Sequence, residues 1–205
     1  MPIRRRSLLA LVAASPALAR LAAAGQNPPP GDLAAPRTLG KPDARIKVTE
    51  FFSLTCSHCA AFQRETFPQV KAEWIDPGKL QIIYHDFPLD RVALMAAMVA
   101  RALPPERYEP FITALFASQD RWAFARGVDS AAELEKLALL AGLSHDTFQA
   151  TIDNQQLKQF IAAEQQQAET DYHVDSTPTF LCNGKTHAGE MSYASFVQFI
   201  TKAGG

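Results

Sequence analysis

The chain has few cysteines and almost no net charge. Three cysteines among 205 residues are too few for a small scaffold held together by disulfides, so a hydrophobic core must stabilise the fold. Lysine and arginine together number 20 against 21 acidic residues, which leaves a formal net charge of −1. This balance gives no reason to expect nucleic acid or an anionic membrane surface as a partner. The length allows one sizeable domain, or one domain with an insertion.

The N-terminus lacks an apolar run long enough to span a bilayer, and stable membrane insertion is not expected. Arginines at positions 4–6 precede an apolar run at residues 7–19, and small residues of the Ala-x-Ala type follow up to Ala24. This order of basic, apolar and small residues is typical of a secretory signal peptide, which we predict for residues 1–24. The arginines before Ser7 also resemble a twin-arginine signal. An uncleaved anchor is the alternative.

Two of the three cysteines, Cys56 and Cys59, are separated by two residues. They follow the apolar pair Phe51-Phe52 and precede a helix-compatible segment at residues 60–64. At a helix N-terminus, backbone N–H groups and the helix dipole stabilise a thiolate, and such a pair can cycle between dithiol and disulfide. By itself the spacing also suits half of a zinc site or an inert structural disulfide. Outside the cytoplasm a dithiol is not kept reduced by default, so an exported pair would donate or reshuffle disulfides.

The first part of the chain predicts a strand-helix-strand unit. Residues 25–43 are rich in proline and predict an extended linker, with a short edge strand near residues 37–39. The β-branched and aromatic residues at 46–52 favour a central strand. A helix is expected over residues 57–76, with a kink at Pro68. Residues 80–87 form the second strand, which should be parallel to the first.

The second part of the chain predicts helices and then a hairpin. Residues 90–172 are helical almost throughout, with Asp90 as one N-cap and a capping box that begins at Ser130. This length is too great for a loop and indicates an inserted helical subdomain. A strand at residues 176–182 then leads into Asn183-Gly184, a strong hairpin signal, so the strand at residues 185–188 should pair antiparallel with it. A final helix capped by Ser192 ends the chain.

This order of elements, with Cys-x-x-Cys opening the first helix and a proline beginning a later strand, resembles the thioredoxin fold. The helical insertion makes the chain similar to the DsbA family, most of all to DsbA-type proteins of alphaproteobacteria. The resemblance covers residues 40–203. The segments that carry it are Glu50-Phe51-Phe52-Ser53, Cys56-Ser57-His58-Cys59, Asp86-Phe87-Pro88-Leu89-Asp90 and Ser176-Thr177-Pro178-Thr179-Phe180.

The resemblance implies an α/β chain with a thioredoxin fold and an inserted helical subdomain. The first half of the thioredoxin domain should cover residues 44–89, and its second half should cover residues 173–205. The helical insertion should cover residues 90–172. Together with the signal peptide at residues 1–24 and the linker at residues 25–43, these ranges account for the whole chain.

The resemblance also assigns roles around the cysteine pair. Cys56, exposed at the helix start, should form mixed disulfides with clients, and the buried Cys59 should be its partner. His58 should favour the Cys56 thiolate through a hydrogen bond or a positive charge. Family members often carry proline where this chain has Ser57, so the redox potential could move in either direction. The alternative for His58 is an exposed side chain without effect.

Three further residues complete the expected site. Glu50 lies on the strand before the motif, and the resemblance implies a buried acid with a raised pKa that exchanges a proton with Cys59. A solvent-facing glutamate is the alternative. Pro178 should follow a cis peptide bond and face the cysteines, while the Thr177 backbone should pair with an extended client segment. Cys182 is expected to be buried and inert.

The implied function is that of an exported thiol-disulfide oxidoreductase, a periplasmic oxidase that a DsbB-type membrane partner reoxidises. The clients would be exported cysteine-containing proteins, and we expect a monomer that needs no metal or cofactor. An isomerase or reductase is the alternative, although residues 25–45 are too short for the dimerisation domain of many isomerases. A peptide-binding chaperone is a further alternative. A zinc protein, with Cys56, Cys59, Cys182 and His187 as ligands, is the last.

Overall fold

A computed structural model describes residues 33–204. The predicted signal peptide and the first residues of the predicted linker lie outside this range. None of the helices formed by the described residues has the length and apolar content needed to cross a bilayer.

The centre of the fold is a five-stranded mixed sheet in the order β1-β3-β2-β4-β5. Strand β2 (Ile46–Phe52) pairs in parallel with β3 (Leu80–Asp86) and antiparallel with β4 (Thr179–Cys182). Edge strand β1 (Arg37–Leu39) runs antiparallel to β3, and β5 (Lys185–Ala188) pairs back on β4. The predicted central strand, edge strand, parallel pair and hairpin are therefore confirmed.

The segment after the cysteine motif is helical but not continuous. Helix α1 (Ser57–Glu65) is followed by α2 (Phe67–Val70) and by a wider turn, η3 (Lys71–Ile75). The break falls at Thr66, because Pro68 has no N–H to continue the ladder of hydrogen bonds and its ring crowds the preceding turn. The hydroxyl of Thr66 donates to the carbonyl of Met191 at 2.7 Å, which fixes the break against the C-terminal part of the chain. The predicted kink at Pro68 is thus a break between two helices.

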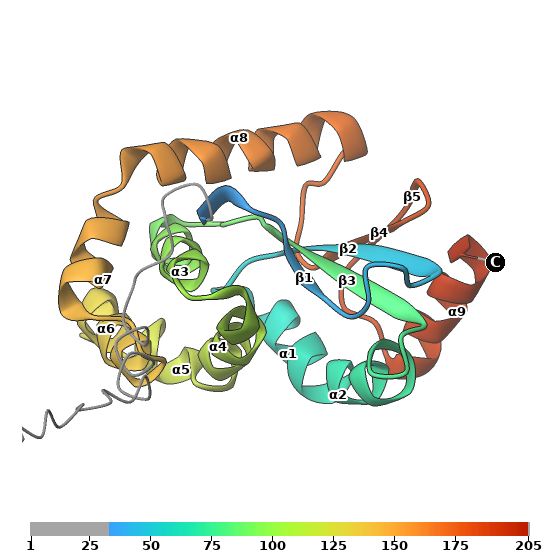
Figure 1. Ribbon diagram of the computed structural model, residues 1–205, viewed down its shortest axis with the longest axis horizontal. Coiled ribbons are helices and arrows are strands. Elements are labelled where there is room, and N and C mark those ends of the chain that lie inside the picture. Colours follow the sequence, from blue (N-terminus) through green and yellow to red (C-terminus); the bar gives the residue numbers. More distant parts are fainter. Residues whose placement is uncertain (1–32, 205) are drawn as a thin grey trace, which may run out of the picture.

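The insertion between β3 and β4 is entirely helical. Figure 1 shows α3 to α7 gathered beyond one end of the sheet, while α8 runs back across it toward β4. Asp90 caps α3 as predicted, but Ser130 does not cap α6. The carboxylate of Asp129 accepts hydrogen bonds from the amides of Ala131 and Ala132, because its charge also complements the helix dipole. The helices are α3 (Arg91–Ala102), α4 (Pro105–Ala117), α5 (Gln119–Trp122), α6 (Ser130–Leu140), α7 (His145–Ile152) and α8 (Gln155–Tyr172).

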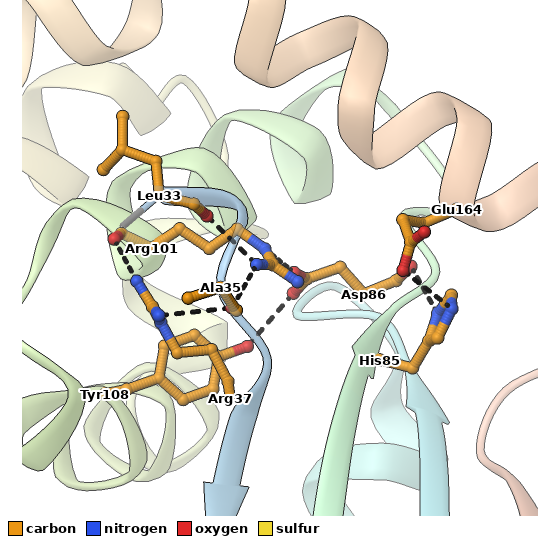
Figure 2. Close-up of polar contacts among 8 residues, drawn as sticks. All are labelled: Leu33, Ala35, Arg37, His85, Asp86, Arg101, Tyr108 and Glu164. Atoms are coloured by element: carbon orange, nitrogen blue, oxygen red, sulfur yellow. Dashed lines mark hydrogen bonds and ion pairs between the residues drawn. The ribbon is translucent and has the colours of Figure 1, made fainter. Parts of the chain in front are cut away.

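A buried polar network joins the insertion to the sheet (Figure 2). Arg101 of α3 forms an ion pair with Asp86 at the end of β3, with Nε and Oδ2 2.5 Å apart, and it also donates to the carbonyls of Leu33 and Ala35. The hydroxyl of Tyr108 on α4 donates to the second oxygen of Asp86 at 3.2 Å. Arg37 of β1 donates to the Arg101 carbonyl at 2.7 Å. The described part of the predicted linker is therefore packed into the fold.

The last helix, α9 (Tyr193–Gly204), covers the sheet on the side of β2 and β4. The hydroxyl of Ser192 accepts from the amide of Ser195 at 3.3 Å, which confirms Ser192 as the residue that caps this helix. Phe196 and Ile200 are fully buried, and Phe196 contacts Phe62 of α1 and Phe180 of β4. The core therefore lies directly beneath the helix that carries the cysteines.

Candidate active site

Cys56 is the N-cap residue of α1, so its sulfur lies at the open end of the helix. The thiol donates to the Thr177 carbonyl, with sulfur and oxygen 3.2 Å apart. A hydrogen bond from the Cys59 side chain outweighs desolvation and, with contributions from the Thr177 side chain and the amides of Cys59 and His58, lowers the pKa of Cys56 to about 5. Only 7% of Cys56 is accessible, so the prediction of an exposed thiol is wrong. The backbone carbonyl of Thr177 lies against this sulfur.

Cys59 lies one turn further into α1 and is fully buried, as predicted. Both cysteines are free thiols in the structure. Burial raises the pKa of Cys59 well above its usual value, and both the neighbouring Cys56 and the charge of Glu50 raise it further. The two sulfurs are therefore neighbours with opposite acidities.

Glu50 occupies the central strand beneath the cysteines, and it is buried rather than solvent-facing. Only 2% of the residue is accessible, and its Oε2 atom has no hydrogen-bond partner among the described residues. Desolvation by burial raises the pKa of Glu50 to about 8. A carboxyl group with this pKa carries its proton at neutral pH and can give it up to a stronger base.

The segment before β4 faces the cysteines through a cis peptide bond between Thr177 and Pro178. This is the predicted isomer at the predicted position. The carbonyl of Ser176 accepts from the Thr179 hydroxyl at 2.8 Å, which holds the turn into β4. The Thr177 carbonyl accepts a hydrogen bond from the Cys56 thiol, so the backbone of Thr177 lies directly beside the sulfur of Cys56.

Two side chains that the sequence did not single out for this role hold the loop before Cys56. Gln119 of α5 is 5% accessible, and its amide donates to the carbonyls of Leu54 and Cys56 at 2.8 and 3.1 Å. Asp90 accepts from the hydroxyl of Thr55 at 2.6 Å while it caps α3. The insertion therefore fixes the active-site loop from two directions. Gln119 has no sequence signal of its own, because only the packing of α5 on this loop gives it a partner.

The comparisons with known proteins agree with this geometry. A family model described as thioredoxin matches residues 33–202. The structure is similar to that of alpha-DsbA1 from Wolbachia pipientis, with a TM-score of 0.76 and 32% identity over 83% of this chain and 91% of that one. The chain belongs to the thioredoxin family, as a DsbA-type member.

Three more proteins are similar to this DsbA-type chain. The thiol:disulfide interchange protein DsbA of Salmonella typhimurium is 29% identical over 72% of this chain and 71% of its own length. The structure of a protein-disulfide isomerase from Novosphingobium aromaticivorans is 26% identical with a TM-score of 0.70 and covers 83% of this chain and 97% of that one. The chain spans 59% of the length of a Rickettsia conorii relative provisionally named a protein-disulfide oxidoreductase, at 25% identity over 80% of this chain.

His58 of the DsbA-type motif makes a different contact from the one expected. Its Nδ1 atom lies 3.2 Å from Oε2 of Glu190, in the loop before α9, and both side chains are largely exposed. The backbone amide of His58, rather than its side chain, contributes to lowering the pKa of Cys56. The imidazole is therefore paired with a carboxylate, which counters the positive charge that it could place beside the thiolate.

Cys182 lies on β4 and is fully buried, which agrees with the predicted inert thiol. Burial also raises the pKa of Cys182. Within residues 33–204, no three histidine, cysteine, aspartate or glutamate side chains come together as a metal site requires. The zinc alternative therefore has no ligand set in the described part of the chain.

Proposed function

We propose that this chain is an exported thiol-disulfide oxidoreductase that transfers a disulfide from Cys56 and Cys59 to client proteins. The observation that carries the proposal is the opposite acidity of two adjacent thiols. The pKa of Cys56 is lowered to about 5, and the pKa of Cys59 is raised well above its usual value. A thiolate that is stable at neutral pH stabilises the reduced enzyme, so its disulfide is a stronger oxidant.

The reaction begins when a client thiolate attacks the Cys56 sulfur of the enzyme disulfide. The bond between the two enzyme sulfurs breaks, a mixed disulfide forms, and Cys59 leaves as a thiolate. This thiolate is buried and strongly basic, so it must take up a proton. Glu50 is protonated at neutral pH and its charge acts on Cys59, so Glu50 is the acid that gives up its proton to Cys59.

The second step releases the oxidised client. A second client thiolate attacks the client sulfur of the mixed disulfide, and Cys56 leaves as a thiolate. Its lowered pKa makes Cys56 a good leaving group. The client loses two electrons and the enzyme retains them as a dithiol. Thr177, whose carbonyl already faces Cys56, is the backbone on which an extended client segment pairs beside Pro178.

The sequence supports the cellular setting of the proposal. The signal-like N-terminus favours export to the periplasm, where exported cysteine-containing proteins are the clients. A DsbB-type membrane partner would then return the dithiol to the disulfide. Peptide-binding chaperone activity would use the same Thr177 segment without the cysteines.

A second direction of the same chemistry has one observation in its favour. The Novosphingobium relative is named a protein-disulfide isomerase, and it covers 83% of this chain. Isomerisation requires a Cys56 that is kept reduced and attacks a client disulfide. The two directions use the same residues and differ in the redox state in which the enzyme is held.

Equilibration of the purified protein with reduced and oxidised glutathione tests the direction. We expect a reduction potential above about −150 mV, which marks a disulfide donor. A potential near about −270 mV, the thioredoxin range, would mark a reductant and reverse the assignment. If no Cys56–Cys59 disulfide forms, the oxidoreductase proposal fails altogether. Retention of function in cells by Cys56→Ser would instead favour the chaperone.

A further inference from the structure

Two buried polar side chains lie next to each other across the central strands, and the mechanism above uses only one of them. Glu50 of β2 and Tyr84 of β3 are partners in the register of the parallel pair. Paired residues of adjacent strands point to the same face of a sheet, with their Cβ atoms close enough for side chains to interact. Glu50 is 2% and Tyr84 is 3% accessible.

Neither side chain is satisfied by the rest of the described protein. Oε2 of Glu50 and the hydroxyl of Tyr84 are both buried atoms without a hydrogen-bond partner among residues 33–204. Leaving a buried polar group unpaired costs on the order of 1–3 kcal/mol, so native structures rarely contain two neighbouring examples. A carboxylate accepts hydrogen bonds and a phenol donates one, so these two groups complement each other.

The surroundings of the pair are apolar apart from a few named groups. Cys59 of α1 and Tyr84 both feel the charge of Glu50, which raises the pKa of each. Tyr108 and Glu109 of α4 also act on Tyr84, and Cys182 of β4 lies on the same face as Glu50, two residues along from its partner Phe180. Helix α9 buries Phe196 and Ile200 on this side. Tyr108 is already bonded to Asp86 (Figure 2). Among the described residues, the hydroxyl of Thr177 is also buried without a partner, but Tyr84 is the unpaired donor that is the register partner of Glu50.

We propose that Tyr84 is a positioning residue for Glu50, whose carboxylate receives a hydrogen bond from the Tyr84 hydroxyl, directly or through one water, whenever Glu50 is ionised. This inference rests on the proposed function, because it concerns the acid that protonates Cys59. It extends the site from α1, through β2, to β3.

The hydrogen bond acts at one step of the reaction. When the Glu50 proton moves to the sulfur of Cys59, the S–H bond forms, the carboxyl O–H bond breaks, and the negative charge passes from sulfur to carboxylate. A bare carboxylate at this depth is unfavourable, and a donor from Tyr84 stabilises it. The phenol stays protonated throughout, because burial raises the pKa of Tyr84 well above its usual value. Tyr84 therefore holds the charge and does not carry the proton.

Carbon-13 NMR of glutamate side-chain carboxyls tests the pairing in the oxidised protein, where neither Cys56 nor Cys59 titrates. Glu50→Gln identifies the Glu50 signal. Burial raises the pKa of Glu50 in the unmodified protein to about 8. We expect the Glu50 midpoint of Tyr84→Phe to lie about one pH unit above that of the unmodified protein, because the donor that stabilises the carboxylate is gone. The phenylalanine keeps the ring in its contacts with Phe52 and Tyr108.

Tyr108→Phe is the matched control, because it also removes a buried phenol hydroxyl, but one that is bonded to Asp86. It should leave the Glu50 midpoint unchanged. Coincident midpoints in the unmodified protein and Tyr84→Phe would overturn the inference, as would an equal shift in Tyr108→Phe. A circular dichroism melt establishes that each variant is folded, and Tyr84→Leu, which also lacks a donor, replaces Tyr84→Phe if that variant is not folded.

The rate at which dithiothreitol reduces the enzyme gives a second readout. If Tyr84 acts through Glu50, the ratio of the Tyr84→Phe rate to the unmodified rate changes with pH across the Glu50 titration. A purely structural effect gives a ratio that is constant with pH and contradicts the inference. Absence of disulfide exchange in the unmodified protein would refute the proposed function, while the NMR midpoints would still decide whether Tyr84 pairs with Glu50.

Discussion

The two ends of the first turn of α1 place the same chemical group in opposite environments. At the outer end, the Cys56 sulfur has hydrogen bonds from the Cys59 side chain and from backbone amides, and its pKa falls to about 5. At the inner end, Cys59 and Glu50 have little to offset their desolvation, and their pKa values rise. Both cysteines are buried, so burial alone does not decide whether the pKa of a cysteine rises or falls. The hydrogen-bond donors that reach the sulfur decide it.

The two regions therefore have different roles in the proposed reaction. The outer region stabilises a negative charge on sulfur and so supplies a leaving group. The inner region disfavours negative charge and so keeps protons on Glu50 and Cys59. The proposed transfer of two electrons and a proton between a disulfide and a client uses both regions, which lie within one turn of α1.

Replacing each cysteine by serine gives the largest contrast. Cys56→Ser should reduce disulfide transfer to a dithiol peptide to the background rate, because no enzyme sulfur remains for the client to bond. With a client peptide that carries an internal disulfide, Cys59→Ser should instead accumulate the mixed disulfide between Cys56 and the client, since the neighbouring enzyme thiol that could attack this bond is gone. Non-reducing electrophoresis with mass spectrometry measures both. Accumulation in Cys56→Ser would contradict the assignment of the outer sulfur as the one that clients meet.

Glu50→Gln should change the pH dependence of stability. The folded protein keeps a proton on Glu50 between its ordinary pKa of 4.5 and about 8, while the unfolded chain releases it. Unfolding therefore becomes more favourable as the pH rises through this window, and stability falls by at most about 5 kcal/mol. We expect Glu50→Gln to be more stable than the unmodified protein at pH 8 by several kcal/mol on the same scale, and not at pH 4. Urea unfolding at both pH values measures it.

The exposed residue Glu65, which follows on α1, provides the control for this experiment. Glu65→Gln should leave the pH dependence of unfolding unchanged, because the side chain of Glu65 is exposed on the surface of α1. Equal behaviour of the two variants would mean that Glu50 is not held in an unfavourable environment.

Gln119→Ala tests how far the insertion contributes to the outer environment. It removes the donor to the carbonyls of Leu54 and Cys56, and leaving these buried acceptors unpaired should cost about 1–3 kcal/mol of unfolding free energy. We also expect the pKa of Cys56 to rise, because the loop that holds its sulfur against the first amides of α1 is less restrained. Gln166→Ala on the exposed face of α8 is the control, and it should change neither quantity. If the pKa of Cys56 stayed the same in Gln119→Ala, the hydrogen bonds of Gln119 would contribute to the stability of the fold and not to the acidity of Cys56.

Glu190→Gln should have the smallest effect. The pair between His58 and Glu190 is largely exposed, and exposed ion pairs contribute about 0–1 kcal/mol. Removing the carboxylate should therefore change the rate of disulfide transfer by less than about fivefold, and added salt should shrink the difference. A larger change would mean that the His58 side chain acts on the thiolate more strongly than its contact with Glu190 indicates.

The sequence predicted those features that depend on short segments. The apolar strand at residues 46–52, the hairpin at Asn183-Gly184 and the helix cap at Asp90 each have a local cause, and the structure contains them. The motif and the proline before β4 pointed to the same site from opposite ends of the chain. Their joint occurrence made the fold predictable.

The remaining features depend on contacts between distant segments. Cys56 is buried against the backbone of Thr177, which lies 121 residues away in the sequence. Gln119 reaches the loop before Cys56 because the four-residue helix α5 packs there. Asp129 caps α6 instead of Ser130. Both side chains can accept hydrogen bonds from the first amides of a helix, and the sequence does not show which of two adjacent acceptors will do so. The sequence did not predict a role for Tyr84, because tyrosine is common in strands and its pairing with Glu50 is visible only in the register of the sheet.

Titration of the reduced protein, followed by the ultraviolet absorbance of thiolates, tests the central claim most directly. We expect one thiolate that forms with a midpoint at about pH 5 and is lost in Cys56→Ser. We also expect Cys59 to stay protonated well beyond pH 9.0. If both thiols titrated together near their ordinary pKa of 9.0, the two cysteines would lie in equivalent environments, which would contradict the opposite acidities proposed for them.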